Sequence, residues 1–524
     1  MGMVACQQRI ASAFVVCFGP FGAVSQHARD RGVCRQTVYR EAAWVEARVD
    51  GSAWQEQGER LRQDNGELRE RVAQLQRHLE QAVLVNEDKQ EEFATVAQAI
   101  GVSLSDAHTL LEVLLPADQV VSVATLGRRS QAAGRKAGDL LEVLDAWARP
   151  RVRQAVADEI YVSPPVLMVV EPESLCWVVG RRRDEPVTGA AWAEELARLP
   201  ALEQVARDGG HCLGRGLADL NRQRRQKGLP AVGDQLDHFH LLREGGRVVG
   251  RAERFARRAF GALEAAEAEW AERGRRGQSR AGYHSHVRAC LAKAERAMDI
   301  WSGQERAWEQ VKAALRPFTP AGELNTRARA EAVLAEVLPQ LPDPAFASFK
   351  RQLRRPEALT YLDEIQRKLA ALPGPVAVCN AAVRQEGIRR HPELLQGETT
   401  EAAALRGVLL SCAVILALAG AIGQRTVAAV RALLRSSWRA SSLVECVNSV
   451  VRMQQARHRK LSQGLLNLKR LYWNSHVFRT GRRRGKSPYQ HLGIAWPEGV
   501  RWWDVLKWSP EQLGRELSAR TMAT

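Results

Sequence analysis

Three acidic residues have surroundings that suit catalysis on phosphodiesters. Asp158 lies in the largely apolar run ADEIYV, Asp208 is followed by two glycines in ARDGG, and Glu445 lies in SSLVECVNSVV. Phosphodiester cleavage without a covalent enzyme intermediate needs an activated water or hydroxyl and relief of charge at the leaving oxygen. Two divalent cations about 3.5 to 4 Å apart supply both, and carboxylates from different elements can hold them. We therefore predict that Asp158, Asp208 and Glu445 are catalytic and bind two metal ions.

The first two acids fall in a stretch whose patterning changes to short β-like runs. Valine-rich segments bounded by proline or glycine, EIYV, PVLMVVEP and SLCWVVGRRR, predict three buried strands. A helix over 190–199, a strand over 203–206, a helix over about 214–226 and a strand over 234–242 follow. Asp158 is expected to open the first strand and Asp208 to end the fourth. Three strands, helix, strand, helix, strand is the order of a ribonuclease-H-like α/β sheet, although other α/β domains share parts of it.

The third acid belongs to a predicted helix that starts at Ser441 or Ser442. Its apolar positions can face a core: Leu443, Val444, Val447, Val450 and Val451. Spacings of three and four place the polar positions on one stripe: Glu445, Asn448, Ser449 and Arg452. An acid, an amide and an arginine pointing the same way suit a metal ion and a phosphate.

The charge of the chain indicates a polyanionic partner. Its 76 Lys and Arg against 59 Asp and Glu give a formal charge of +17 and a pI near 9.9. Charge alone is equally compatible with an acidic surface or with solubility. The basic residues near Glu445 are expected to contact DNA phosphates: Arg452, Arg457, Arg459, Lys460, Arg482, Arg483, Arg484 and Lys486, together with the amide of Asn448.

The N-terminal region predicts helices that read DNA sequence. Residues 23–46 suit a helix, a turn at Gly32 and a second helix, as in a helix-turn-helix. The start of the second helix would face the major groove through Arg35, Gln36, Thr37 and Arg40. A small helical hairpin with a solvated basic face is the alternative. A second pair over 93–115, with Gly101 in the turn and Ser103 as N-cap, and a basic helix over 127–147 complete this region.

A heptad pattern connects the two helical regions. The d positions are Leu61, Leu68, Leu75 and Ala82, and the a positions are Asn65, Val72 and Leu79. A short coiled coil and a homodimer are predicted, with an intramolecular helical hairpin as the alternative.

Strand patterning disappears after Arg243 for nearly two hundred residues, which predicts an all-helical insertion. The uncharged run Gly407–Gly423 is short for a membrane span, so we expect a buried helix and no membrane association. The nine cysteines include no Cys-x-x-Cys pair, which indicates free thiols in a reducing cytoplasm. The start of the chain has no basic region, so we expect no signal peptide.

The expected modules are 1–53 helix-turn-helix, 54–90 coiled coil, 91–150 second helical DNA-binding region, 151–245 first core part, 246–435 helical insertion, 436–495 second core part with the catalytic helix, and 496–524 C-terminal tail.

The run SSLVECVNSVVRMQQARHRKLSQGLLNLKRLYWNSHVFRTGRRRGKSP resembles the C-terminal catalytic segment of bacterial insertion-sequence transposases of the DDE class. An acid-bearing helix with a following Asn-Ser, a basic segment, a Tyr-x-Asn-x-His phrase and Gly-Lys-Ser-Pro carry the likeness, and ADEIYV and ARDGG resemble that class's two aspartate strands. The resemblance covers about 152–245 and 436–494. It implies a ribonuclease-H-like core with a helical insertion, Mg²⁺ or Mn²⁺, and transposon-end and target DNA as substrates. Cys446 departs from it, because a small residue such as Gly is expected there.

A second group of candidate ligands lies in the predicted fifth strand. Asp237, His238 and His240 could bind a metal ion, or Asp237 could replace Asp208 as the second acid. We expect instead that they cap the fifth strand near the site, with His238 or His240 bonding DNA or a catalytic acid. We place Asp208 first, because the second acid of this fold follows the fourth strand.

These observations predict a nucleoid-associated DNA transposase that cleaves DNA and transfers strands. Two alternatives share the fold. A transposase-derived DNA-binding protein would keep the fold and charge without turnover, and a metal-dependent nuclease would cleave without joining.

Overall fold

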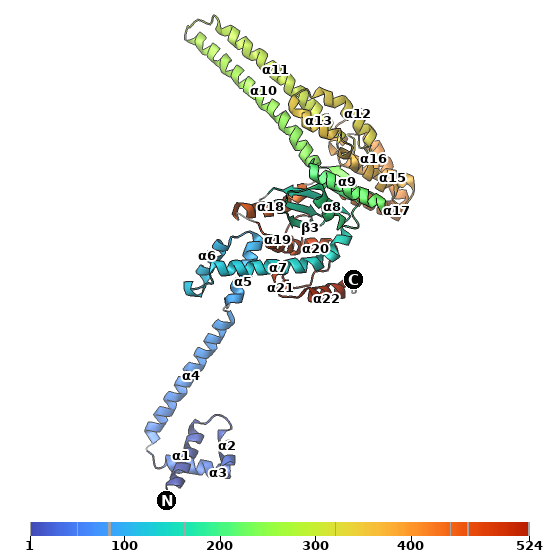
Figure 1. Cartoon of the computed structure of the whole chain (residues 1–524). Helices are drawn as coiled ribbons and strands as arrows, with labels where there is room; N and C mark the ends of the chain where they lie inside the picture. The colour runs from blue at the N-terminus through green and yellow to red at the C-terminus, as the bar shows by residue number, and fades with distance from the viewer. Residues whose placement is uncertain are drawn as a thin grey trace. The chain divides into compact units, whose positions relative to one another are not determined.

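The computed structural model describes residues 2–49, 51–81, 85–161, 164–319, 321–440, 442–457 and 461–521. The chain divides into two compact units, Met1–Asn86 and Glu87–Thr524, and each is treated by itself (Figure 1). Arg459 and Lys460 lie outside the described residues, and the side chain of Arg457 is not described.

The first unit begins with three helices, α1 Met3–Phe18, α2 Ala23–Asp30 and α3 Arg35–Glu46. The helix pair predicted over 23–46 is confirmed, and Gly32 has the positive φ of 65° that its turn requires. Glu41 of α3 accepts hydrogen bonds from Arg31 and from Ser12 of α1, so charge-assisted bonds fix the three helices together. The four candidate base-reading residues lie in the first two turns of α3, with Arg35, Gln36 and Arg40 exposed and Thr37 half-buried.

Helix α4, Gly51–Gln81, is one uninterrupted helix, which excludes a helical hairpin within it. Four of the predicted heptad positions, Leu61, Leu68, Val72 and Leu75, are exposed along it. Ala82 lies outside the described residues, and the side chain of Leu79 is not described. The coiled coil between two copies stays a prediction that this exposed seam fits.

The second unit contains a five-stranded sheet in the order β3-β2-β1-β4-β5. Its strands are β1 Gln154–Ile160, β2 Val166–Val170, β3 Trp177–Arg182, β4 Gln204–Arg207 and β5 Gly233–Leu236. The pairs β1–β2 and β2–β3 are antiparallel, whereas β1–β4 and β4–β5 are parallel. With α8 Gly189–Ala197 before β4 and α9 His211–Gln226 after it, the predicted order of elements is confirmed.

Two strand predictions are wrong in detail. Asp158 lies near the end of β1 rather than opening it, since the strand already begins at Gln154. The fifth strand ends at Leu236 instead of 242, because Asp237 caps a helix that starts at His238.

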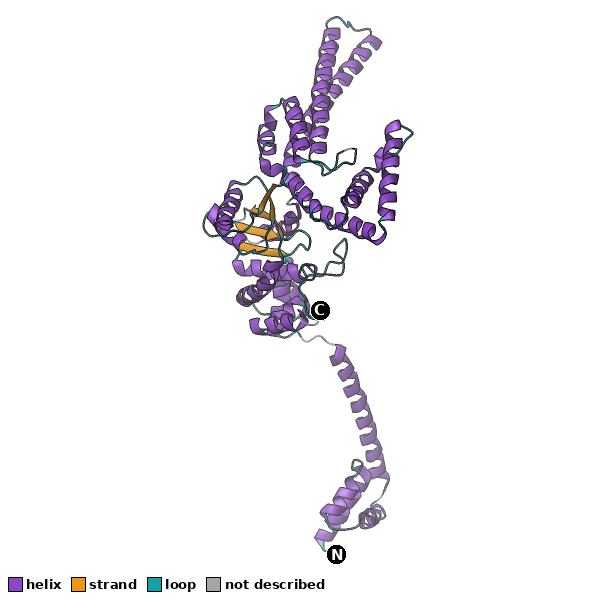
Figure 2. Cartoon of the chain, turned by 90° about the vertical axis from the view of Figure 1, so that its right-hand side faces the viewer, coloured by secondary structure: helices purple, strands orange, loops and turns teal. Residues whose placement is uncertain are grey.

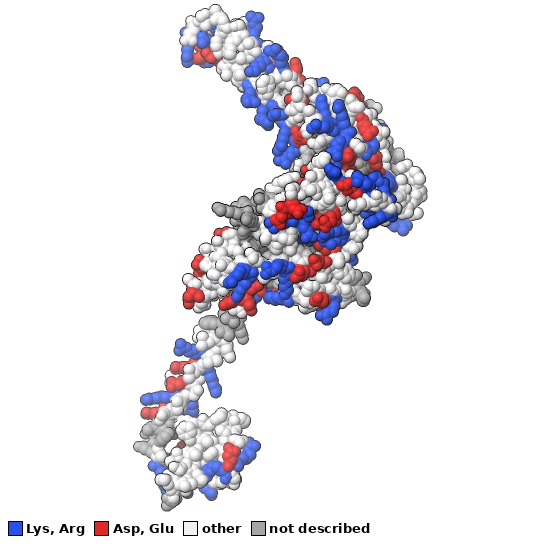
Figure 3. All heavy atoms as spheres, in the orientation of Figure 1, with Lys and Arg blue, Asp and Glu red and all other residues white. Residues whose placement is uncertain are grey.

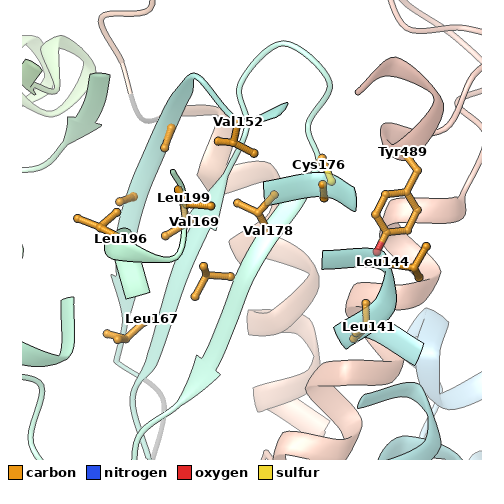
Figure 4. Packing of buried hydrophobic residues seen from close by; sticks show 14 of the residues in the cluster. Leu141, Leu144, Val152, Leu167, Val169, Cys176, Val178, Leu196, Leu199 and Tyr489 are labelled. Atoms are coloured by element: carbon orange, nitrogen blue, oxygen red, sulfur yellow. The ribbon is translucent and has the colours of Figure 1, made fainter. Parts of the chain in front are cut away.

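Helices cover both faces of the sheet (Figure 2). On β1 the alternate residues Ala155 and Ala157 pack in one core with α8, α9 and α7 Val123–Ala148, while Val156 and Ile160 pack in another with α18 Ser442–Arg457. Figure 4 shows part of the first core, in which Leu167 and Val169 of β2 lie on the side of Leu196 of α8, and Leu141 and Leu144 of α7 lie beside Tyr489.

The predicted second DNA-binding region belongs to this fold and is not a separate module. Its helices are α5 Glu87–Ile100, α6 Leu104–Leu114 and α7 Val123–Ala148. Ser103 caps α6 as predicted, accepting a hydrogen bond from the Asp106 amide at 3.0 Å. Helix α7 buries Leu140, Leu141 and Leu144 in the sheet core and packs on α19, Gln463–Ser475. The C-terminal helices α20 Pro488–His491, α21 Trp502–Val505 and α22 Pro510–Thr521 also join this core.

Between β5 and α18 the described chain is helical, as predicted, apart from an isolated bridge between Phe318 and Leu324. Its α-helices are α10 His238–Arg275, α11 Tyr283–Ala314, α12 Arg327–Val337, α13 Ala347–Leu353, α14 Thr360–Ala370, α15 Val376–Arg389, α16 Thr400–Leu418 and α17 Gly420–Arg435. Short 3-10 turns complete the chain: η1 Ala117–Gln119, η2 Arg149–Arg151, η3 Leu338–Gln340, η4 Pro344–Phe346, η5 Pro356–Ala358 and η6 Pro392–Leu395. The insertion has its own apolar core around Trp308, Phe349 and Tyr361.

The prediction of a buried helix over 407–423 is wrong. Helix α16 ends at Leu418, and a new helix starts at Gly420, whose φ of 54° marks the break. Among the described helices, α16 is the one long and apolar enough to cross a membrane by length and composition, and 17% of its apolar window is buried. The sequence is apolar on all sides of this helix and therefore does not indicate which side is exposed. In the structure much of the helix is exposed, including Leu410 and Leu418.

Candidate active site

Asp158 is positioned by strand alternation and by one hydrogen-bonding partner on α18. It lies two residues from both Val156 and Ile160, so its side chain points to the face that α18 covers. Asn448 Nδ2 donates to Asp158 Oδ2 at 2.7 Å, and the Glu159 amide donates to Oδ1 at 2.8 Å. Asp158 is 7% exposed, so a buried carboxylate is held in a fixed orientation.

The charges of the other two predicted acids, Asp208 and Glu445, act on Asp158. Burial, followed by the nearby charge of Asp208 and that of Glu445, raises its pKa from 3.8 to about 6. The bonds from Glu159 and Asn448 oppose this rise and only partly offset it. Asp158 thus experiences an excess of negative charge, which a cation would relieve.

Asp208 follows β4 directly and borders a cavity of about 630 Å³. Its Oδ1 accepts a hydrogen bond from the Gly210 amide at 2.9 Å, which sets the turn before α9. The cavity is lined by Asp208, Gly209, Gly210, His240, Arg243, Glu244, Arg247 and Gln352. Asp208 therefore faces a space that is open to a substrate and bordered by arginines.

Glu445 lies in the first turn of α18 and forms an ion pair within its own helix. Arg452 Nη1 donates to Glu445 Oε2 at 2.7 Å. In the part of the chain that the structure describes, no three His, Cys, Asp or Glu side chains are gathered closely enough to hold one metal ion. Binding of a shared ion by all three acids would require Glu445 to leave Arg452.

The donor chemistry of the site nevertheless fits a divalent cation. Carboxylate and amide oxygens are the ligands preferred by Mg²⁺ and Mn²⁺. Asn448 Oδ1 is buried and has no hydrogen-bond partner among the described residues, although its Nδ2 is bonded to Asp158. A buried acceptor without a donor, next to a carboxylate with a raised pKa, is a position that a cation or its bound water would satisfy.

The start of α10 separates Asp237 and His240 from His238, the third residue of the second candidate group. Asp237 is the N-cap of α10: Oδ1 accepts from the Phe239 amide at 2.6 Å, and Oδ2 contacts His240 Nδ1. This bond, together with the charges of Asp237, Asp158 and Asp208, raises the pKa of His240 despite its partial burial. Both carboxylate oxygens of Asp237 are used, one by the N-cap of α10 and the other by His240. The prediction that Asp237 caps a strand is wrong, because it caps a helix.

His238 points away from this site. Its Nε2 donates to the Ala358 carbonyl at 2.7 Å, and its ring packs edge-on against Tyr361. Burial lowers its pKa to about 4, and the charge of Arg439 adds to the effect. His238 is a neutral core residue of the insertion, so Asp237, His238 and His240 do not form one ligand cluster.

The predicted phosphate contacts divide into exposed and structural residues. Arg482, Arg484 and Lys486 are exposed, and Arg482 lies 3.7 Å from Glu173. Arg483 donates from Nε and Nη2 to the carbonyls of Glu173 and Pro172, at 2.6 and 2.7 Å. These bonds hold the β2–β3 turn, and the DNA contact of Arg483 stays a prediction. In the same segment, Ser487 of Gly-Lys-Ser-Pro caps α20 through a capping box.

Residues on α19 that the sequence did not single out secure the edge strand β3. Asn474 accepts from the Trp177 amide at 2.7 Å and donates to its carbonyl at 2.9 Å. Buried Arg470 donates to the carbonyls of Trp177 and Val178 and pairs with Asp145 of α7. The Tyr-x-Asn-x-His phrase contains Asn474, but no local pattern indicates a partner almost three hundred residues away.

The pKa of Asp158 predicts a pH-dependent effect of Asp158→Asn on stability. With a folded pKa above the unfolded value, the folded chain retains a proton that the unfolded chain releases between about pH 4 and 6. Ionised Asp158 therefore costs up to about 3 kcal/mol above that range. In EDTA, Asp158→Asn should raise the free energy of unfolding at about pH 8, with the gain disappearing as the pH falls to about 4. Urea unfolding at several pH values measures it, with exposed Asp184→Asn as control. An equal effect at every pH would contradict the assignment.

None of the family models, curated proteins or solved structures compared with this chain matches it.

Proposed function

We propose that this chain is a DDE-type DNA transposase with a ribonuclease-H-like core, catalysing cleavage and strand transfer at insertion-sequence ends. The observation that carries the proposal is the buried Asp158, whose pKa is raised by burial and by Asp208 and Glu445 from two other elements. The strand order β3-β2-β1-β4-β5, with three antiparallel strands followed by two parallel ones, supports the proposed fold. A helical insertion before the last acid agrees with it.

Asp158, Asp208 and Glu445 would hold two Mg²⁺ or Mn²⁺ ions, with Asn448 Oδ1 as a further oxygen donor. When bound, such ions lower the pKa of an attacking water or 3′-hydroxyl and offset charge on the leaving oxygen. Asn448 keeps the Asp158 carboxylate oriented through its 2.7 Å bond. Arg452 can exchange Glu445 for a DNA phosphate, which frees the third carboxylate and places a guanidinium beside the scissile strand.

The remaining surfaces have roles in the same proposal. Arg35, Gln36, Thr37 and Arg40 at the start of α3 would read the transposon ends, and exposed Arg482, Arg484 and Lys486 would bind phosphates of any sequence. The exposed heptad positions of α4 would join two copies into a homodimer. The site of action would be the bacterial nucleoid.

A cleavage and strand-transfer assay tests the function. The purified full-length chain is incubated with a plasmid that carries the DNA flanking its gene, with Mg²⁺, Mn²⁺ or EDTA, and the products are sequenced. Metal-dependent nicks at the ends, with joined products, are expected. Cleavage without joined products would favour the nuclease. Specific binding of the ends without cleavage would favour the DNA-binding protein, an outcome in keeping with the Glu445–Arg452 pair.

A further inference from the structure

One face of the long helix α10 carries a row of arginines. The row consists of Arg243, Arg247, Arg251, Arg254 and Arg258, and all five are exposed. Their spacings of four, four, three and four residues match the helical period of 3.6, so the five side chains share one side of the helix. His240 belongs to the same side, one turn before Arg243. We refer to these five residues as the arginine stripe.

The stripe is unneutralised, in contrast to the other arginines of the same helix. None of its five members forms an ion pair with a residue that the structure describes, whereas Arg257 pairs with Glu253, and Arg275 and Arg276 pair with Glu272. Figure 3 shows Lys and Arg atoms gathered along α10. Ordinary surface arginines of a charged helix pair with acids at neighbouring turns. The stripe therefore presents a continuous positive potential to solvent.

The stripe starts at the candidate active site. Arg243 and Arg247 line the same cavity as Asp208, together with His240. Since α10 is one continuous helix from His238 to Arg275, the other three arginines follow in line away from that cavity. From Arg243 to Arg258 the helix rises about 22 Å at about 1.5 Å per residue. That length corresponds to roughly six base pairs at about 3.4 Å per nucleotide of a strand.

We propose that the arginine stripe of α10 binds the phosphate backbone of the DNA that extends from the active site, over about half a turn of duplex. The proposal rests on the proposed function, since it takes the cavity beside Asp208 as the place of the scissile phosphate. Guanidinium groups form bidentate hydrogen bonds with phosphate oxygens, and a row at regular intervals suits a polymer of regularly spaced phosphates. An acidic protein partner would explain the charge but not why the row begins in the cavity.

A binding experiment on the full-length chain tests the stripe without requiring catalysis. The affinity for a labelled duplex of random sequence is measured in EDTA over a range of salt concentrations. The triple variant Arg247→Gln, Arg251→Gln, Arg254→Gln is compared with the control Arg257→Gln, Arg275→Gln, Arg276→Gln, which removes the same charge from the same helix and its C-cap. The stripe variant should bind more weakly, and the slope of log affinity against log salt should fall by about 3, or about one per lost phosphate contact. The control should keep the slope of the unmodified chain.

A photo-crosslinking residue at 251 or at 257 supplies a second measurement. DNA should crosslink at 251 and not at 257. Equal loss of affinity in both triple variants would overturn the proposal, and so would an unchanged affinity in the stripe variant. The proposal would also fail if polyglutamate, but not unlabelled DNA, suppressed the crosslink at position 251. The stripe variant could lose DNA binding while the unmodified chain shows no cleavage. That result would support DNA binding by the arginine stripe and contradict the proposed transposase activity.

Discussion

Replacing Glu445 by glutamine should reduce Mg²⁺-dependent cleavage of plasmid DNA by at least about 10³-fold. In the proposed site Glu445 supplies one of three carboxylates, and metal ions contribute several kcal/mol of charge stabilisation to the transition state. Glutamine preserves size and the ability to accept a hydrogen bond from Arg452, so the α18 helix should keep its structure. Quantified nicking of a plasmid carrying the flanking DNA, under single-turnover conditions, measures the loss.

The matched control is Glu401→Gln, which removes an exposed acid from the first turn of α16. It should cleave like the unmodified chain. DNA affinity measured in EDTA should be retained by Glu445→Gln, which distinguishes loss of chemistry from loss of substrate. Cleavage by Glu445→Gln at the original rate would remove Glu445 from the proposed site.

Replacing Arg470 by methionine should lower the free energy of unfolding by about 3 to 5 kcal/mol, the range for breaking a buried ion pair. Arg470 is 7% exposed and pairs with Asp145, which is 3% exposed. The substitution leaves that carboxylate buried with Arg149 as its remaining ion-pair partner among the described residues, and it removes the donors to the Trp177 and Val178 carbonyls. Urea unfolding followed by tryptophan fluorescence measures the change.

Arg501→Met is the control for this experiment. Arg501 pairs with Asp504 at the surface, where such pairs contribute about 0 to 1 kcal/mol. The double substitution Arg470→Met, Asp145→Leu should recover part of the loss, because it removes the unpaired buried charge. If the urea midpoint of Arg470→Met were as high as that of Arg501→Met, the buried Arg470–Asp145 pair would not contribute to stability.

Local patterns were sufficient to predict the order of elements in the core. Valine-rich runs bounded by proline and glycine revealed the second and third strands, because buried strands need continuous apolar side chains. The first strand lies mostly before the predicted EIYV run, over Gln154–Ile160. The fifth strand was predicted too long, because the apolar residues Leu241 and Leu242 suit a strand or a helix equally, and Asp237 in fact caps a helix there. Hydrophobicity also failed for α16, because composition does not reveal whether a neighbouring helix covers a surface.

The candidate site shows the same limit. The polar stripe on α18 followed from helical periodicity, and the structure places Asn448 in contact with Asp158, 290 positions earlier. Periodicity could not show that Glu445 pairs with Arg452, nor that Arg483 is used by two backbone carbonyls. Such partners depend on how distant segments meet, and single residues within a basic run are not distinguished by their type.

The side-chain contacts along β3 also determine how copies of this chain can associate. Its outer edge would ordinarily present free amides and carbonyls to any extended peptide. Asn474 bonds both polar groups of Trp177, and Gln463 accepts from the Arg182 amide at 2.9 Å and donates to the Gly180 carbonyl at 2.9 Å. With these groups already satisfied, strand addition at this edge has no hydrogen bonds to gain. The sheet is protected there from growing into a multichain ribbon.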